Sequence, residues 1–146
     1  MSLLRVEGLT VRYGPLEAVR GVGFALDQGQ ALTLIGPNGA GKTSVLRGLL
    51  GLARAEGRVV LEGEELRVRS PEALLERGLV LVPEGRALFP GLPVEDNLLL
   101  GGFLRYRRRE SLRPDLERVY ALFPRLKERR RQPAGTLSGG EQQMLA

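Results

Sequence analysis

The residues GPNGAGKT, positions 36–43, constrain the fold more than any other part of the sequence. They fit the pattern G-x-x-x-x-G-K-[ST] and lie between the short apolar run ALTLIG and KTSVLRGLLGL, whose apolar residues recur at helical spacing. A buried strand that runs into a glycine-rich loop and then a helix directs several backbone N–H groups toward one point. The sequence therefore predicts an α/β fold with a phosphate-binding loop.

This loop is predicted to hold a nucleotide with Mg²⁺. Its predicted binding residues are Gly36, Pro37, Asn38, Gly39, Ala40, Gly41, Lys42, Thr43 and Ser44. The glycines let the backbone wrap closely around phosphate oxygens. Lys42 would bridge the β- and γ-phosphates, the Thr43 hydroxyl would coordinate Mg²⁺, and Ser44 would reach the α-phosphate. A plain glycine-rich turn with an exposed lysine is the alternative, and the flanking strand and helix argue against it.

Strand–loop–helix units are expected along the first part of the chain and helices along the rest. Strands are predicted at 3–13, 21–26, 31–35, 57–63, 64–69 and 79–82, and helices at 42–52, 71–78, 95–106 and 114–130. The runs 31–35 and 79–82 are apolar throughout, which is typical of parallel strands buried on both faces. Ser70 is the expected N-cap of the helix at 71–78. The later helices should be interrupted at Gly101–Gly102 and at Pro124.

Composition excludes several kinds of chemistry. The chain has no cysteine, hence no disulfides or thiolate chemistry, and no histidine, the commonest general base and a usual zinc ligand. No secretory signal and no apolar run of membrane-spanning length is found in the sequence. Residues 1–100 hold 11 Lys/Arg and 12 Asp/Glu, a net charge of −1, whereas residues 101–146 hold 11 and 5, a net charge of +6. The basic part favours a solvated helical face over a nucleic-acid interface, because no recognition motif accompanies it.

The segment LSGGEQQ, residues 137–143, is the second motif. Ser138 suits an N-cap and Glu141 the acidic partner in a capping box. GPNGAGKTS followed by LSGGEQQ resembles the nucleotide-binding subunit of ABC transporters, the ATP-binding cassette family. The resemblance implies a P-loop NTPase cassette with an antiparallel β subdomain, a parallel-sheet core that is incomplete here, and a helical subdomain. The expected division is a nucleotide-binding core at 1–90 and a helical subdomain at 91–146.

The resemblance also implies a site shared between two chains. Family cassettes pair head to tail, so Ser138, Gly139, Gly140 and Glu141 would contact ATP held by a second ATPase subunit. Tyr13 stands at the position of the aromatic that stacks on adenine, with a solvent-facing strand-end tyrosine as the alternative. Glu84 stands where most members have a glutamine near the metal. On this resemblance its carboxylate would ligate Mg²⁺, as would the Thr43 hydroxyl. The implied cofactors are ATP and Mg²⁺, and the implied location is the inner face of the cell membrane, beside transmembrane permease subunits.

The segments VPEGR and LFPGLPVEDNL resemble the subfamily that energises branched-chain amino acid uptake. A urea or amide importer and a nucleic-acid- or translation-associated ABC ATPase are the alternatives, although no nucleic acid is expected as a partner. The family's metal-binding aspartate, catalytic glutamate and γ-phosphate-sensing histidine match nothing in this sequence, and Glu84 is the one candidate substitute. The resemblance therefore implies the first three-fifths of an ATPase, able to bind nucleotide and inactive in hydrolysis by itself.

Overall fold

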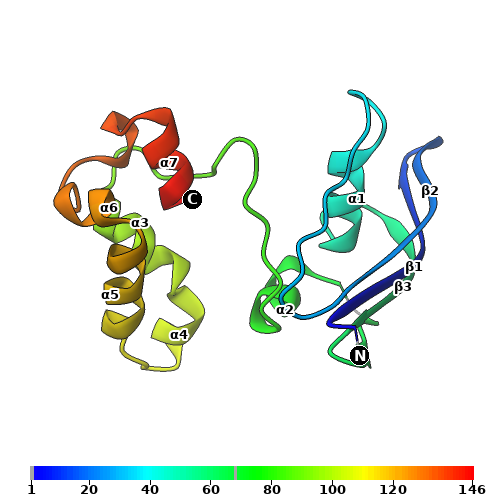
Figure 1. Cartoon of the computed structure of the whole chain (residues 1–146), viewed down its shortest axis with the longest axis horizontal. Helices are drawn as coiled ribbons and strands as arrows, with labels where there is room; N and C mark the ends of the chain where they lie inside the picture. The colour runs from blue at the N-terminus through cyan, green and yellow to red at the C-terminus, as the bar shows by residue number, and fades with distance from the viewer. Residues whose placement is uncertain (1, 68) are drawn as a thin grey trace. The chain divides into compact units, whose positions relative to one another are not determined.

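A computed structural model describes residues 2–67 and 69–146. The chain forms two compact units, one extending as far as Leu81 and the other comprising Val82–Ala146 (Figure 1). Each unit encloses a hydrophobic core of its own. The units are therefore described one at a time. The division into a nucleotide-binding core at 1–90 and a helical subdomain at 91–146 stays a prediction.

The first unit is built on a four-stranded antiparallel sheet. Its strands are β1 (Leu4–Tyr13), β2 (Leu16–Leu26), β3 (Ala55–Leu61) and β4 (Glu64–Glu65), in the order β2-β1-β3-β4. A bulge near Gly8, which has φ 64°, shifts the alternation of β1 by one residue, so that Val6 and Leu9 both face the core. The strand expected at 64–69 is shorter than predicted, and its Val68 lies outside the described residues.

Two helices accompany this sheet. Val45 and Leu49 of α1 (Lys42–Leu49) enter the same core as the buried side chains of β1 and β3 (Figure 1). The second helix, α2 (Pro71–Glu76), begins as predicted, since the Ser70 hydroxyl accepts a hydrogen bond from the Ala73 N–H at 3.2 Å.

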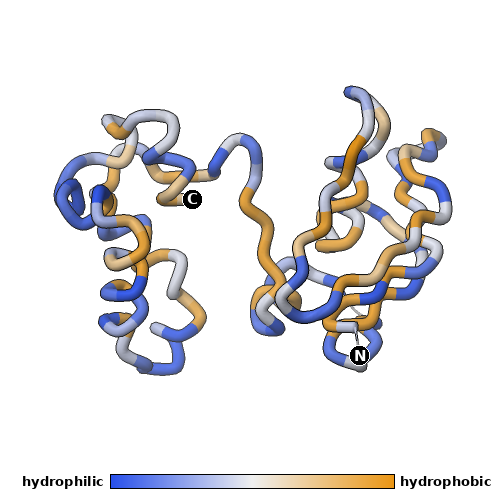
Figure 2. Tube along the Cα trace, viewed as in Figure 1, coloured by the Kyte–Doolittle hydropathy of each residue, from blue (hydrophilic) through white to orange (hydrophobic). Residues whose placement is uncertain are grey.

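The prediction of two buried parallel strands at 31–35 and 79–82 is wrong for this structure. Neither run is a strand, and all strand pairs within the described residues are antiparallel. Leu34 and Leu79 pack against the core, whereas Ile35 is 91% exposed and Val80 61% exposed. A parallel strand needs neighbours that pair with its backbone, and no strand of the described residues pairs with either run. Figure 2 shows the apolar stretch that follows α2.

The second unit is helical. It contains α3 (Val94–Gly101), α4 (Phe103–Arg107), α5 (Arg113–Leu122), α6 (Pro124–Glu128), the 3₁₀ turn η1 (Ala134–Thr136) and α7 (Gly139–Leu145). The predicted interruptions fall at Gly102 and at Phe123–Pro124. Val94, Leu126 and Ala134 are fully buried in its core. Across the two described ranges, every helix is too short or too polar to cross a bilayer.

Candidate nucleotide site

The loop at residues 36–41 depends on glycine at its last position. Gly39 and Gly41 have φ values of 86° and 95°, in the left-handed region that other residues rarely adopt. A Cβ atom at Gly41 would lie 2.7 Å from the carbonyl oxygen of Ala18 in β2, whereas one at Gly39 would meet nothing within 4 Å. The loop therefore rests directly on β2, and only glycine fits this contact.

The Lys42 ammonium group lies inside the loop. Its Nζ donates hydrogen bonds to the carbonyl oxygens of Gly36 at 2.5 Å and Pro37 at 2.8 Å, and the Ala40 N–H donates to Pro37 at 3.1 Å. Gly41 is the N-cap of α1, and among the described residues no side chain caps this helix end. Free N–H donors, the positive end of the helix dipole and an ammonium group thus meet at one exposed loop, which is the arrangement that binds phosphate.

Tyr13 is the last residue of β1, pairs with Leu16 and is 40% exposed. The Ala18 carbonyl that contacts Gly41 lies two residues after Leu16 in β2, so this one strand adjoins both the tyrosine and the phosphate loop. The structure therefore brings these two predicted parts of the site to the same strand.

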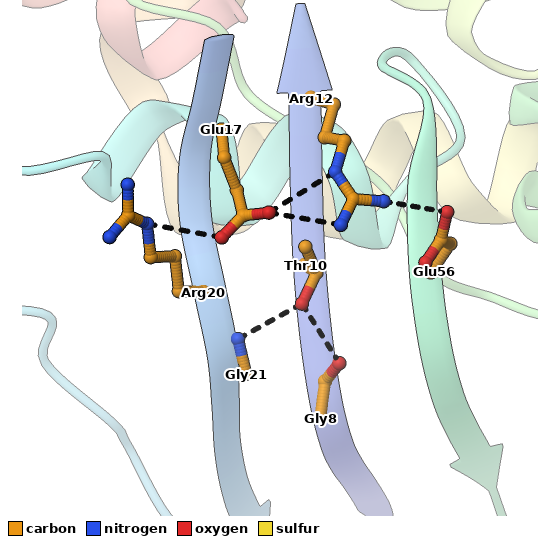
Figure 3. Close-up of polar contacts among 7 residues, drawn as sticks. All are labelled: Gly8, Thr10, Arg12, Glu17, Arg20, Gly21 and Glu56. Atoms are coloured by element: carbon orange, nitrogen blue, oxygen red, sulfur yellow. Dashed lines mark hydrogen bonds and ion pairs between the residues drawn. The ribbon is translucent and has the colours of Figure 1, made fainter. Parts of the chain in front are cut away.

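An ion-pair network that the sequence interpretation missed ties together the strands beside Tyr13. Arg12 donates to Glu17 at 2.9 and 3.2 Å and to Glu56 at 2.8 Å, and Arg20 pairs with Glu17 at 3.0 Å (Figure 3). The hydrogen bond to Glu17, and then that to Glu56, raises the pKa of Arg12. Alternating opposite charges at 12, 17 and 20 were the available sequence signal, but only the pairing of β1 with β3 brings Glu56 to Arg12.

The segment LSGGEQQ, residues 137–143, is called the signature segment, and its Ser138 caps α7 as predicted. The Ser138 hydroxyl accepts from the Glu141 N–H at 3.3 Å, and the Ser138 N–H donates to the Glu141 carboxylate at 2.9 Å. Hydrogen bonds from Ser138, and the nearby Arg129, hold the pKa of Glu141 below its ordinary value. Ser138, Gly139 and Gly140 are exposed, so this helix start is accessible to a partner.

Glu84 lies on an exposed turn of the second unit, whereas Lys42 and Thr43 belong to the first. A shared metal site for Glu84 and Thr43 therefore stays a prediction, as does any role of Glu84 in hydrolysis. Residues 2–67 and 69–146 contain no cluster of three or more Asp, Glu, His or Cys side chains suited to a metal ion. Mg²⁺ bound with a nucleotide takes only one or two protein ligands beside the phosphates, so the exposed Thr43 hydroxyl fits this role by itself.

A second candidate site is an apolar groove of about 780 Å³ on the helical unit. It is lined chiefly by Leu92, Leu99, Leu100, Phe103, Leu112 and Leu116. Phe103 is 52% exposed, and Phe89 in the preceding loop is 57% exposed. Exposed large apolar side chains beside a groove are typical of a surface that binds another protein.

Asn97, which the sequence interpretation left without a role, shapes the loop before α3. Its carboxamide oxygen accepts from the Phe89 N–H at 2.9 Å. Its Nδ2 donates to the carbonyls of Phe89, Leu92 and Pro93 at 3.1, 3.3 and 3.0 Å. One side chain thus holds both ends of the loop that carries Phe89 and Leu92. An asparagine in the first turn of a predicted helix was the only sequence signal.

Comparison of the sequence with known proteins leads to the same family that the two motifs resemble. The family profile described as ABC transporter matches residues 19–146. The high-affinity branched-chain amino acid transport ATP-binding protein BraG of Pseudomonas aeruginosa is 42% identical over 145 residues, which cover 99% of this chain and 61% of BraG. The probable branched-chain amino acid transport ATP-binding protein LivF of Archaeoglobus fulgidus is 32% identical, with the same two coverages.

Solved structures show the same fold. The ADP conformation of MJ1267, an ATP-binding cassette of an ABC transporter, superposes with a TM-score of 0.77 at 27% identity, covering 99% of this chain and 62% of that one. The chain belongs to the ABC transporter family. It has the mixed α/β fold of that family's ATP-binding cassette, with the predicted antiparallel β subdomain, and it spans 61% of the length of BraG and of LivF.

Proposed function

We propose that this chain forms the nucleotide-binding part of the ATPase subunit of an importer for branched-chain amino acids. The observation that carries the proposal is the loop at the head of α1, where Gly41 rests on β2 and the Lys42 ammonium is held by two carbonyls. The substrate class rests on similarity to BraG and LivF, which are named as branched-chain amino acid transport ATP-binding proteins. A urea or amide importer is the alternative.

In this proposal ATP binds with its phosphates at the first turn of α1. Lys42 exchanges its bonds to the Gly36 and Pro37 carbonyls for bonds to the β- and γ-phosphates, which are stronger because both partners are charged. Thr43 holds Mg²⁺ with the phosphates, Ser44 reaches the α-phosphate, and Tyr13 stacks on adenine.

The remaining contacts come from partners. Exposed Ser138, Gly139 and Gly140, with Glu141 behind them, would close over ATP held by a second ATPase subunit. The matched relatives include both BraG and BraF of Pseudomonas aeruginosa, each named a branched-chain amino acid transport ATP-binding protein, which supports a heterodimer as one option beside a homodimer. The pair would work at the inner face of the membrane, on transmembrane permeases.

Substitution of Lys42 tests the nucleotide site. Lys42→Ala removes charge-assisted bonds of about 1.5–3 kcal/mol each, so the affinity for MgATP should fall at least about tenfold in a fluorescent-nucleotide titration. Lys127→Ala is the matched control, because the chain has no other lysine and this one is exposed on α6. Equal binding by Lys42→Ala and the control would refute the assignment.

Hydrolysis by the 146-residue polypeptide alone should not exceed background. The family's general base matches no residue of this sequence, and base assistance contributes about 10²–10⁴-fold. Phosphate release measured with and without Lys42→Ala separates true turnover from contamination. Lysine-dependent turnover that disappears in Glu84→Gln would instead assign the catalytic role to Glu84.

The apolar groove is proposed to receive a permease segment, because its lining combines exposed leucine and aromatic side chains. A photoreactive residue at Leu92, which lines the groove, or at the exposed Phe89 in the loop before α3 should crosslink to the permease in the assembled transporter. Leu122, which is 73% exposed and does not line the groove, is the control position. Crosslinks from Leu122 without crosslinks from Phe89 or Leu92 would reject this docking site.

A further inference from the structure

Arg86 connects the loop that contains Glu84 to α7, the helix that begins in the signature segment. Its Nη1 donates to the side-chain oxygen of Gln142 at 3.2 Å, and its Nη2 is 3.5 Å from where a Cβ at Gly139 would lie. Gln142 in turn donates through Nε2 to the carbonyl of Leu137 at 3.1 Å. One guanidinium group therefore lies beside the first residue of α7 and bonds to Gln142 in the same helix, and all of these residues belong to the same compact unit.

The backbone of Arg86 is part of the turn that carries Glu84. The Arg86 N–H donates to the Pro83 carbonyl at 2.9 Å, and the next N–H, that of Ala87, donates to the Gly85 carbonyl at 2.7 Å. Arg86 thus closes this turn with its main chain while its side chain contacts α7. A displacement of the turn would therefore strain the Arg86–Gln142 hydrogen bond, because the same residue takes part in both.

Three features of Arg86 are unfavourable for stability alone. Arg86 and Ala87 have φ values of 61° and 52°, a conformation that residues with a Cβ adopt with strain. Within the described residues the buried Arg86 Nε has no hydrogen-bond partner. Its positive charge also lies near the N-terminal end of α7, which the helix dipole makes positive. Such features persist mainly where function requires them.

We propose that Arg86 is a positioning residue that fixes the direction of Ser138–Gly140 relative to the turn at Glu84. The proposal rests on the proposed ATPase function, in which this helix start acts on a second subunit's nucleotide. The helix cap itself does not need Arg86, because Ser138 and Glu141 bond to each other and Arg129 pairs with Glu141. Loss of Arg86 should therefore change the orientation of α7 and leave the unit folded.

The test compares Arg86→Ala, Gln142→Ala, the double variant and Arg86→Lys in the complete gene product. Arg118→Ala is the matched control, because this arginine side chain is 76% exposed and pairs with Asp115 three residues away on the same helix, α5. Three readouts are taken: the dissociation constant for MgATP, the kcat and KM of hydrolysis, and hydrogen exchange of the α7 amides. Lys42→Ala accompanies them as the check on nucleotide binding.

We expect kcat to fall at least about threefold in Arg86→Ala with KM and ATP affinity unchanged, since coupling residues act at about this scale without touching ligand. Gln142→Ala should lower kcat at least as far, because it also loses the bond to the Leu137 carbonyl, and the double variant should fall no further than Gln142→Ala. Arg86→Lys keeps the positive charge but loses the planar guanidinium with its several N–H donors, so it should not restore kcat. Exchange at the start of α7 should quicken in Arg86→Ala and stay unchanged in Arg118→Ala.

Unchanged kcat, additive single effects or unchanged α7 exchange would overturn the inference. Failure of the proposed function looks different: Lys42→Ala would bind MgATP normally, or the complete protein would not hydrolyse it, while the α7 exchange result would still report on Arg86. Faster exchange throughout the helical unit would also reject the positioning role, since it would indicate that Arg86 only stabilises the fold.

Discussion

Gly39 and Gly41 have similar left-handed backbones in different surroundings, which separates two causes of glycine dependence. Gly39→Ala should destabilise the first unit by about 1–2 kcal/mol, the usual penalty of a Cβ in this conformation. Gly41→Ala should destabilise it more and weaken MgATP binding, because its Cβ would also collide with the Ala18 carbonyl. Urea unfolding and nucleotide titration measure both effects. Equal losses for the two variants would mean that the loop does not rest on β2.

Glu141 gives the helix cap a pH dependence. Its pKa is lowered in the folded chain, so its carboxylate contributes stability above the ordinary glutamate pKa of about 4.3 and loses it as pH falls through the lower folded value. Glu141→Gln keeps a capping-box side chain without the charge. Between neutral pH and about pH 3, the melting temperature of the wild type should therefore fall more than that of the variant. Parallel pH profiles would contradict the lowered pKa.

At the scale of elements, Asn97 links the start of α3 to the loop before it. Asn97→Ala removes one acceptor and three donated bonds, and it should destabilise the helical unit by about 1–3 kcal/mol. Asn97→Asp is the matched variant, because it keeps the acceptor for the Phe89 N–H and loses the donors. In thermal unfolding, the melting temperature of the wild type should be higher than that of either variant. Asn97→Ala at wild-type stability would show that backbone contacts alone hold this loop.

Local signals predicted the elements best where one residue decides the geometry. Ser70 and Ser138 each cap the helix expected of them, and Gly102 and Pro124 interrupt helices at the expected places. These outcomes depend on bonds within a few residues, which a sequence displays directly. The two runs at 31–35 and 79–82 failed for the opposite reason: a strand exists only beside another strand, and apolar composition says nothing about whether one is present.

The candidate site shows the same difference. The phosphate loop was predictable because its glycines and Lys42 act through backbone geometry within eight residues. Arg86 and Glu56 were missed because their partners are 56 and 44 residues away, and only the folded chain brings them together. Asn97 was missed although its partners lie four to eight residues before it, because no capping or turn pattern in the sequence marks its bonds. Whether Glu84 approaches Thr43 depends on two separate units, and no pattern within either one contains that information.

At the scale of the whole molecule, charge and apolar surface are unevenly distributed. Residues 101–146 carry a net charge of +6, and Arg113, Arg118 and Arg125 form exposed ion pairs within about one helical turn, which contribute little to stability. Apolar side chains are exposed along the runs at 31–35 and 79–82 as well as at the groove of the helical unit. Repulsion between like charges opposes association of copies through residues 101–146, whereas the exposed apolar runs favour association.

The 146-residue polypeptide expressed alone should consequently self-associate or aggregate. Leu32, Ile35, Val80 and Val82 are each between 48% and 91% exposed, and the runs that carry them lack strand partners among the described residues. Pairing of these segments between copies would satisfy their backbone groups and cover their side chains, as at an open sheet edge. Size-exclusion chromatography with light scattering should show species above 16.0 kDa.

Two substitutions make this prediction specific to the runs. Ile35→Lys combined with Val80→Lys places a charge in each run, at side chains that are 91% and 61% exposed. The monomer should lose little stability because these side chains are exposed, whereas the charges oppose association between copies. The double variant should shift the distribution toward monomer. Leu122→Lys, at an apolar residue that is 73% exposed on α5, is the control and should leave association unchanged. A wild-type polypeptide that is a monodisperse monomer with one cooperative melting transition would contradict the prediction, because the exposed runs would then need no partner.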